Sequence, residues 1–196
     1  MSSGSKPATT TGRPWRETNG SKTADPVSGG WWLYTFTADT VSLNDYPKLG
    51  IWNDGIYMSA NLFKRGRTYA GTKVWALNRD DLISGAPLRS VAFTLGTSYF
   101  SLLPANLKGT LAPTGTPEYF MSDYGSNTSM KLWKFTVNWT TPTASTFTGP
   151  TSFTVASFTR PTTSVPQLNS TETLDTLGDR LMSWLQYRNV NGVQSL

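Results

Sequence analysis

The chain has 196 residues, of which 15% are charged, and 17 Lys and Arg against 12 Asp and Glu give it a formal net charge of +5. It contains no His and no Cys, which excludes a Ser-His-Asp triad, a cysteine nucleophile, a His-ligated metal site and a disulfide within this chain. The length is that of one substantial domain, and 8 Trp, 8 Tyr and 9 Phe among many Ser and Thr favour an all-β class.

Residues 1–30 are rich in Ser, Gly, Thr and Pro and contain a single aromatic residue, Trp15. Such a segment buries too little apolar surface to offset the entropy lost on ordering, so we expect a flexible arm. A strand-like run at 31–37 follows at once. We therefore expect residues 31–196 to form the folded domain.

Short strand-like runs recur about every ten residues, separated by Gly, Pro, Asn and Asp. The expected strands are 31–37, 51–52, 56–62, 72–78, 89–95, 119–121, 130–139 and 153–158. One helical turn is expected at 80–83, closed by Gly85, and another at 183–187. Segments 96–118 and 140–174 contain many prolines and show no clear period, so they are expected to be long loops that contribute to any binding surface.

Alternation within the run at 130–139 predicts that Trp133, Phe135 and Val137 share the face that packs in the core. Regular short strands without intervening long helices favour a propeller, a sandwich or a barrel over βαβ units.

Five segments carry a family resemblance. They are D-Y-P-K-L-G-I-W-N-D-G-I-Y-M-S-A-N at 45–61, W-A-L-N-R-D-D-L-I-S-G at 75–85, L-L-P-A-N-L-K-G at 102–109, L-W-K-F-T-V-N-W at 132–139, and L-G-D-R-L-M with Q-Y-R-N at 177–189. In this order they resemble segments of large, uncharacterised secreted bacterial β-propeller-like proteins. The resemblance implies an all-β fold, a partial β-propeller-like array of antiparallel four-stranded sheets with long loops, located outside the cell or at its surface.

Members of that family extend beyond both ends of this chain, so the resemblance implies an internal fragment with at most four blades. An incomplete ring leaves strand edges unpaired, and we therefore expect self-association or pairing with missing segments of a larger parent. The basic residues are scattered, with 64–67 as the densest group, which does not predict nucleic-acid binding. No run approaches the roughly 18 to 20 apolar residues of a membrane span, so we expect no membrane insertion, and any secretion signal to lie outside this chain.

Carboxylates are the candidate catalytic groups. Asp45, Asp54 and Asp123 lie in or beside expected turns, and the segment between the first two can place both at one rim. Glycoside hydrolysis needs two carboxyl groups about 5 to 10 Å apart, although turn Asp residues also accept backbone hydrogen bonds in a purely structural role. The turns at 53–55 and 122–125 offer hard oxygen ligands, so calcium is the possible cofactor and Asp54 and Asp123 are its candidate ligands.

Trp31, Trp32, Trp52 and Tyr57 are the candidate binding residues, because an aromatic face can stack on a sugar ring. Trp31 and Trp32 are adjacent in a strand, so they point to opposite faces and cannot both be buried in a one-sided sheet. The leading hypothesis is a non-catalytic extracellular module that recognises surface polysaccharide or a partner protein. A carboxylate-dependent hydrolase of glycosidic or lactone bonds, with or without calcium, and a structural self-assembling protein are the alternatives.

Overall fold

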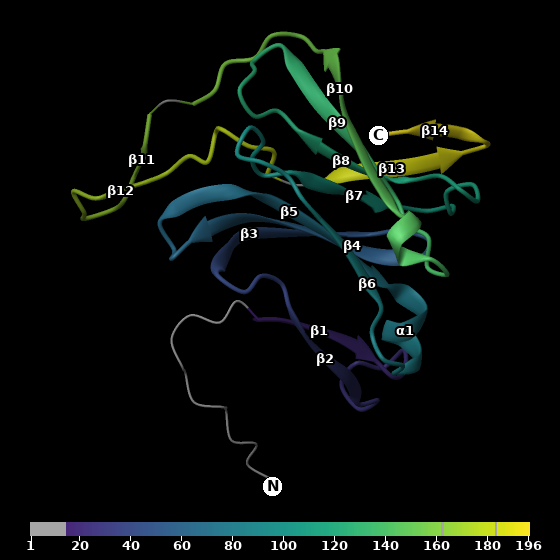
Figure 1. Cartoon of the computed structure of the whole chain (residues 1–196). Coiled ribbons are helices and arrows are strands. Elements are labelled where there is room, and N and C mark those ends of the chain that lie inside the picture. Colours follow the sequence, from purple (N-terminus) through teal and green to yellow (C-terminus); the bar gives the residue numbers. More distant parts are fainter. Residues whose placement is uncertain (1–14, 162, 183) are drawn as a thin grey trace, which may run out of the picture.

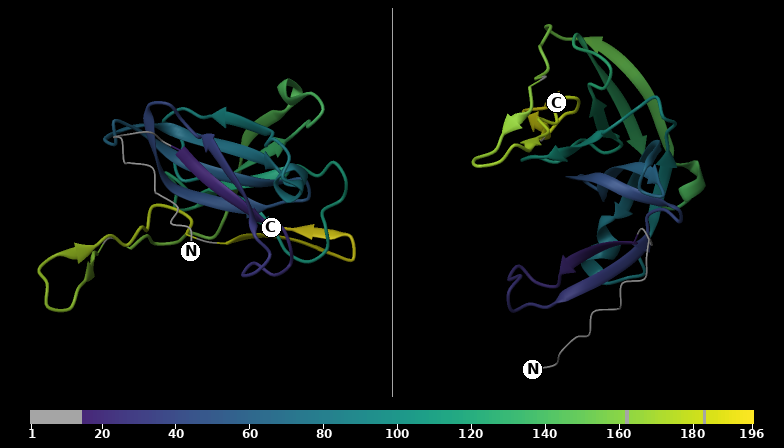
Figure 2. Two further views of the ribbon diagram at one scale, coloured as in Figure 1. Left: turned by 90° about the horizontal axis from the view of Figure 1, so that it is seen from below. Right: turned by 90° about the vertical axis from the view of Figure 1, so that its left-hand side faces the viewer.

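The computed structural model of the protein describes residues 15–161, 163–182 and 184–196. Within these ranges the chain forms fourteen strands, one α-helix and one 3-10 helix, which confirms the all-β class. All strand pairs are antiparallel except that of β7 with β13, which is parallel. Seen from the side, the sheets follow one another along a crescent (Figure 2, right).

The middle layer is an antiparallel sheet in which four consecutive strands lie in the order β3-β4-β5-β6 (Figure 1). Its strands are β3 (Ser42–Ile51), β4 (Gly55–Lys64), β5 (Thr68–Asn78) and β6 (Ser90–Thr94). Along β4, Met58 packs in one apolar cluster with Trp75 and Phe36, whereas Tyr57 packs in a second cluster with Phe135. Both faces of β4 are therefore covered, and its burial is nearly continuous instead of alternating.

The second layer is a sheet of six strands in the order β10-β9-β8-β7-β13-β14. Its strands are β7 (Leu103–Leu107), β8 (Glu118–Ser122), β9 (Ser129–Thr136), β10 (Thr146–Thr154), β13 (Leu185–Val190) and β14 (Val193–Ser195). The 3-10 helix η1 (Pro142–Ala144) precedes β10. Four consecutive strands, β7 to β10, again form an antiparallel meander, but β13 and β14 extend it, so this sheet is larger than the expected four strands.

The two layers meet where β3 passes β7. A Cβ atom at Gly50 would collide with the backbone carbonyl of Ala105, so glycine permits this close approach. The backbone N–H of Ile51 donates to the Oδ1 atom of Asn106 at 3.1 Å. This contact holds the end of β3, and with it the β3–β4 turn, against β7.

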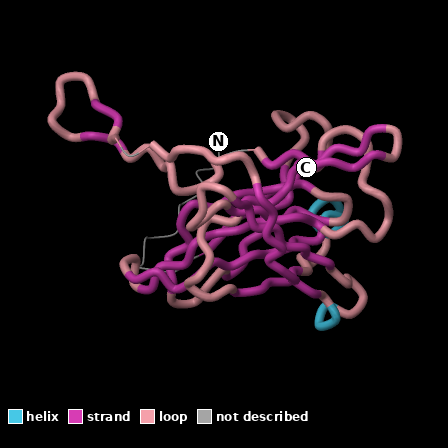
Figure 3. Tube along the Cα trace, turned by 90° about the horizontal axis from the view of Figure 1, so that it is seen from above, coloured by secondary structure: helices cyan, strands magenta, loops and turns pink. Residues whose placement is uncertain are grey.

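Two further hairpins flank these layers. β1 (Trp15–Ser21) pairs with β2 (Trp31–Thr37), and β11 (Val165–Pro166) pairs with β12 (Thr173–Leu174) in a hairpin that protrudes from the body (Figure 3). Part of the segment expected to be a flexible arm is thus a paired strand, because the backbone ladder with β2 holds β1 in place. The rest of that arm, residues 1–14, lies outside the described residues.

The α-helix α1 (Arg79–Ser84) confirms the helical turn expected at 80–83. The Asn78 side chain accepts a hydrogen bond from the Asp81 N–H at 2.9 Å, and Gly85 ends the helix at φ 77°. The turn expected at 183–187 is wrong for the described residues 185–187, which pair with β7 as part of β13. No helix in the described ranges is long and apolar enough to cross a membrane.

Aromatic side chains fill the core between the two layers. Trp133 and Phe135 of β9 are buried and Lys134 between them is exposed, which confirms the predicted alternation. Phe135 makes edge-to-face contacts with Tyr57 and Phe93, with ring centroids 5.3 and 5.2 Å apart. Such pairs add to the stability gained from area burial alone.

Candidate binding pocket at Asp54

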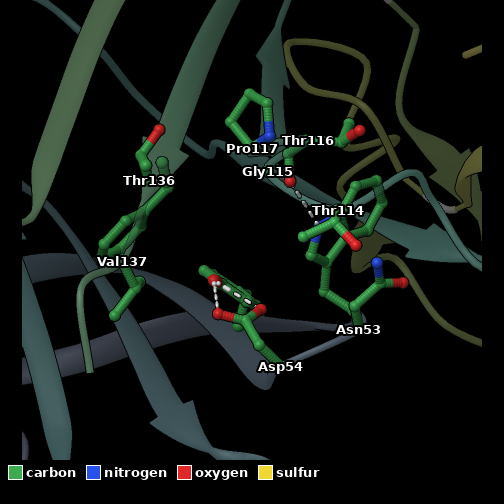
Figure 4. Close-up of a pocket in the computed structure, with 11 residues that line it drawn as sticks. Asn53, Asp54, Thr114, Gly115, Thr116, Pro117, Thr136 and Val137 are labelled. Atoms are coloured by element: carbon green, nitrogen blue, oxygen red, sulfur yellow. Dashed lines mark hydrogen bonds between the residues drawn. The ribbon is translucent and has the colours of Figure 1, made fainter. Parts of the chain in front are cut away.

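A cavity of about 260 Å³ lies between the β3–β4 turn, the β7–β8 loop and the end of β9 (Figure 4). Its lining residues are Trp52, Asn53, Asp54, Tyr57, Thr114, Gly115, Thr116, Pro117, Phe135, Thr136 and Val137. The close-up places Asp54 on one side, the 114–117 loop across from it, and Thr136 with Val137 on a third side. We call this cavity the Asp54 pocket.

Two donors hold the Asp54 carboxylate in place. The Tyr57 hydroxyl donates to its Oδ1 and Oδ2 atoms, at 3.1 and 3.3 Å, and the Trp139 Nε1–H donates to Oδ2 at 2.8 Å. The backbone carbonyl of Asp54 accepts from the Arg79 N–H at 3.0 Å, which anchors the turn itself. A carboxylate offers about four acceptor positions, so Asp54 keeps capacity for further donors.

The loop across the pocket is fastened to the same turn. The Asn53 side chain donates to the Ala112 carbonyl at 2.7 Å and accepts from the Ala112 N–H at 3.2 Å. The Trp52 indole N–H donates to the Thr116 carbonyl at 3.2 Å. These hydrogen bonds hold both walls, so the pocket is formed before any ligand arrives.

A second carboxyl group, that of Glu118, lies in the core behind the pocket wall. Glu118 is 0% exposed, and its two side-chain oxygens have no hydrogen-bond partner within the described part of the chain. Burial raises the pKa of Glu118 well above its ordinary value, and the charge of Asp54 adds to this rise. The nearby backbone N–H groups of Ala105 and Tyr119 lower the pKa of Glu118, although neither reaches hydrogen-bond geometry, and burial has the larger effect.

The same surroundings act on Tyr57. Burial is the largest cause that raises the pKa of its hydroxyl, followed by the negative charges of Asp54 and Glu118. The Tyr57 hydroxyl therefore remains a hydrogen-bond donor to Asp54 throughout the neutral range.

The structure does not bring the three predicted carboxylates together. Asp45 is exposed on β3, and the six residues that separate it from the end of this strand span roughly 20 Å, so it does not share a rim with Asp54. Asp123 follows β8 beside the start of β9, whereas Trp139, which contacts Asp54, follows the end of β9. The three carboxylates therefore belong to three separate regions.

The two candidate calcium ligands also have different surroundings. Asp123 is buried, and its Oδ2 atom pairs with the Nη2 atom of Arg160 at 3.1 Å. The guanidinium of Arg160 also donates to the carbonyls of Asp123 and Ser126, so a positively charged side chain already binds the oxygen atoms of this turn. No three His, Cys, Asp or Glu side chains come together among the residues that the structure describes.

The four aromatic candidates divide into two groups. Trp52 and Tyr57 are only 3% and 1% exposed, so they support the Asp54 pocket from within the core and offer no open ring face. Trp31 is 45% exposed, and its indole N–H donates to the Pro26 carbonyl at 3.1 Å. Trp32 is half-buried beneath the Lys22 ammonium, 3.9 Å from the ring centroid. Both lie on β2 and do not line the Asp54 pocket.

Comparisons of the chain with known protein families, with curated proteins and with solved structures found no match. The proposed ligand is therefore inferred from the geometry of the pocket. The pocket presents one fixed carboxylate, threonine hydroxyls and an apolar wall. This arrangement is suited to accept hydrogen bonds from a small polar ligand.

Proposed function

We propose that the protein is a non-catalytic, β-propeller-like module that acts outside the cell and binds polysaccharide at the Asp54 pocket. The observation that carries this proposal is the preformed cavity with a carboxylate already oriented by Tyr57 and Trp139. Hydroxyl-bearing Thr114, Thr116 and Thr136 and apolar Phe135 and Val137 line the same space. A sugar ring presents hydroxyl groups at its edge and C–H groups on its face. The threonine hydroxyls can therefore bond its edge, and the apolar part of the lining can pack on its face.

Binding is favoured over hydrolysis because a single carboxylate lines the pocket. Glycosidases use two carboxyl groups that both reach the scissile bond. Glu118 is fully buried and absent from the pocket lining, so it cannot contact a substrate. Asp45 and Asp123 lie in other regions of the fold.

The propeller-like architecture is supported by the two successive meanders, β3 to β6 and β7 to β10, each of four consecutive strands. Their arrangement along a crescent agrees with neighbouring blades of a ring. The sequence resemblance to secreted propeller-like proteins points in the same direction and supports an extracellular location. In this architecture β3 and β7 are the first strands of adjacent blades.

An array of immobilised polysaccharides and oligosaccharides tests the proposed function. We expect retention of at least one class of glycan, with no release of reducing ends or shorter products on prolonged incubation. The Asp54→Asn variant should lose binding by roughly tenfold or more, because it removes a charge-assisted acceptor worth about 1.5 to 3 kcal/mol. The exposed Asp45→Asn variant is the control and should bind as the wild type does.

Two results would contradict the proposal. The first is the absence of binding to every glycan on the array. The second is turnover of a glycan that Asp54→Asn abolishes, which would assign the pocket to a hydrolase.

A further inference from the structure

We infer that the Asp54 pocket selects the ammonium group of an amino sugar, so that the ligands are polysaccharides rich in free amino groups. This inference rests on the proposed function and specifies its substrate class. It depends on the charge of the pocket, on the acceptor positions left at Asp54, and on the size of the cavity.

The charge of the pocket is negative and uncompensated. Asp54 forms no ion pair within the described part of the chain, and the pocket lining contains no Lys or Arg. Its two partners, Tyr57 and Trp139, are neutral donors. A partly buried carboxylate without a cation attracts a positively charged ligand more strongly than a solvated one does, because screening by water is weaker.

This lack of a basic residue is unusual for a chain with a formal net charge of +5. Three other cavities in the described ranges each include a basic side chain, namely Lys48, Lys134 and Arg160. The cavity with Arg160 is also lined by Asp175 and Asp179, so the Asp54 pocket differs in sign from the cavities with Lys48 and Lys134. An acidic sugar would be repelled there, and a neutral sugar could donate hydroxyl hydrogen bonds to the carboxylate but would gain no attraction between opposite charges.

The remaining acceptor positions at Asp54 match an ammonium group. One hydroxyl proton and one indole proton occupy part of the capacity of the carboxylate. An ammonium group carries three donors and no acceptor. It can fill the free positions with charge-assisted hydrogen bonds, which are stronger than those from a neutral hydroxyl.

The walls and the size favour a sugar as the carrier of this group. The cavity of about 260 Å³ is below the range of pockets for drug-sized ligands, so it suits one sugar residue of a longer chain. The hydroxyls of Thr114, Thr116 and Thr136 can bond the ring hydroxyls, while Val137, which is supported from the core by the fully buried Phe135, can cover an apolar face. A lysine side chain offers the same ammonium group but leaves the three hydroxyls without ligand partners.

Calorimetric titration tests the inference with four probes. They are a fully deacetylated glucosamine oligomer, its N-acetylated counterpart, a glucose oligomer of equal length, and Nα-acetyl-lysine methylamide. We expect the glucosamine oligomer to bind at least roughly tenfold more tightly than the other three, in line with one charge-assisted hydrogen bond. Asp54→Asn should remove this preference, and Asp45→Asn should retain it.

The wild-type protein provides a test that does not depend on the folding of a variant. Binding of the glucosamine oligomer should weaken with added salt, and should fall as the pH rises and the amino groups lose their protons. Binding that is unaffected by salt and by the charge of the amino groups would overturn the inference.

The other outcomes separate the inference from the proposed function. Equal binding of the acetylated or glucose oligomer at this pocket would leave polysaccharide binding in place and overturn the selection for amino groups. Equal binding of the lysine probe would overturn the sugar as the source of the ammonium group. If none of the saccharides binds here and the glycan array is also blank, the proposed function itself fails.

Discussion

Glu118 is a carboxyl group enclosed in the core behind the Asp54 pocket, and its pKa is raised because burial disfavours the charged form. The folded protein therefore holds this proton more tightly than the unfolded chain does. The stabilisation from this proton is complete below the ordinary pKa of 4.5 and is lost as the pH rises through the folded-state pKa. The chain has no His, so few other groups titrate between about pH 5 and 8.

We predict that the free energy of unfolding falls as the pH rises across this window, by at most about 1.4 kcal/mol per pH unit for one proton. Glu118→Gln should flatten this dependence, because it replaces the titrating group by a neutral one of similar size. Urea unfolding at a series of pH values measures both. The same slope in the wild type and in Glu118→Gln would show that another group is responsible, and Asp45→Asn serves as the exposed control.

Asn61 joins three segments within the core. It is 0% exposed, its Nδ2 atom donates to Ser101 Oγ at 2.8 Å, and its Oδ1 atom accepts from the Ser101 N–H at 2.8 Å. Thr72 Oγ1 also donates to this Oδ1 atom at 3.2 Å. The amide thus ties the segment before β7 to both β4 and β5.

Asn61→Asp should lower the free energy of unfolding by about 1 to 3 kcal/mol, because the new side chain has no N–H to donate and places a carboxyl in the core. Chemical denaturation at pH 7 measures the loss. Asn19→Asp on β1, where the side chain is exposed, is the matched substitution and should change stability little. Equal effects of the two variants would contradict the role of Asn61.

The sequence predicts Asp54 as a candidate site residue but gives no signal for the burial of Glu118. Asn53, Asp54 and Gly55 form a recognisable turn signal, and a turn that ends a strand holds its side chains near a rim. Glu118 closes a segment rich in proline that was expected to be an exposed loop, whereas it begins β8 and is fully buried. Its burial depends on packing between the two layers, which no local pattern reports.

At the scale of elements, strands in which apolar and polar residues alternate regularly could be predicted from the sequence. Strands in which a proline or a register shift interrupts this alternation could not. β2 coincides with the expected run at 31–37, because every second side chain is exposed. β7 and β10 lie inside the two segments expected to be loops. Pro104 interrupts the pattern of β7, and β10 has a register shift between Thr148 and Thr151 at its Gly-Pro step.

The contact of β3 with β7 gives a prediction for glycine. Gly50→Ala places a Cβ atom against the backbone of Ala105, so the two strands must separate, and overpacking of this kind costs about 1 to 3 kcal/mol. A Cβ atom at Gly96 meets no atom within 4 Å, and this residue has no left-handed φ. Urea unfolding should therefore show a loss for Gly50→Ala and a change within about 0.5 kcal/mol for Gly96→Ala.

Gly50→Ala should also weaken glycan binding, because the β3–β4 turn and the β7–β8 loop form opposite walls of the Asp54 pocket. Stability and binding equal to those of Gly96→Ala would contradict the close contact of the two layers.

At the scale of the whole molecule, β3 presents a pair of apolar side chains to solvent. Leu49 and Ile51 lie on one face at the end of this strand and are each more than half exposed, whereas the register shift between Asp45 and Lys48 places Leu43 on the opposite face. Exposed apolar side chains that lie together favour association. In the proposed architecture this pair faces the centre of a ring, where further blades or a second copy would cover it.

We predict that the protein self-associates and that Leu49→Lys combined with Ile51→Lys shifts it toward the monomer. Sedimentation velocity over a range of concentrations measures this shift. Leu174→Lys on the protruding β12 hairpin replaces an equally exposed leucine and should leave the distribution unchanged. A wild-type protein that remains monomeric at all concentrations would contradict the prediction.

The class of the fold could be predicted from the sequence, but the arrangement of its sheets could not. Spacing of short strands indicates all-β structure, because it reflects local alternation. The parallel pairing of β13 with β7 joins segments far apart in the chain, and it turns residues that were expected to form a helical turn into a strand. Contacts of this kind depend on the tertiary fold and leave no periodic signal.

The most direct test of polysaccharide binding at the Asp54 pocket is a crystal structure of the protein with a bound glucosamine oligomer. The account predicts one sugar residue in the cavity, with its amino nitrogen at hydrogen-bond distance, roughly 2.7 to 2.9 Å, from the Asp54 carboxylate. A sugar bound at another surface, such as exposed Trp31 or Trp184, with the Asp54 pocket empty at saturation, would contradict it.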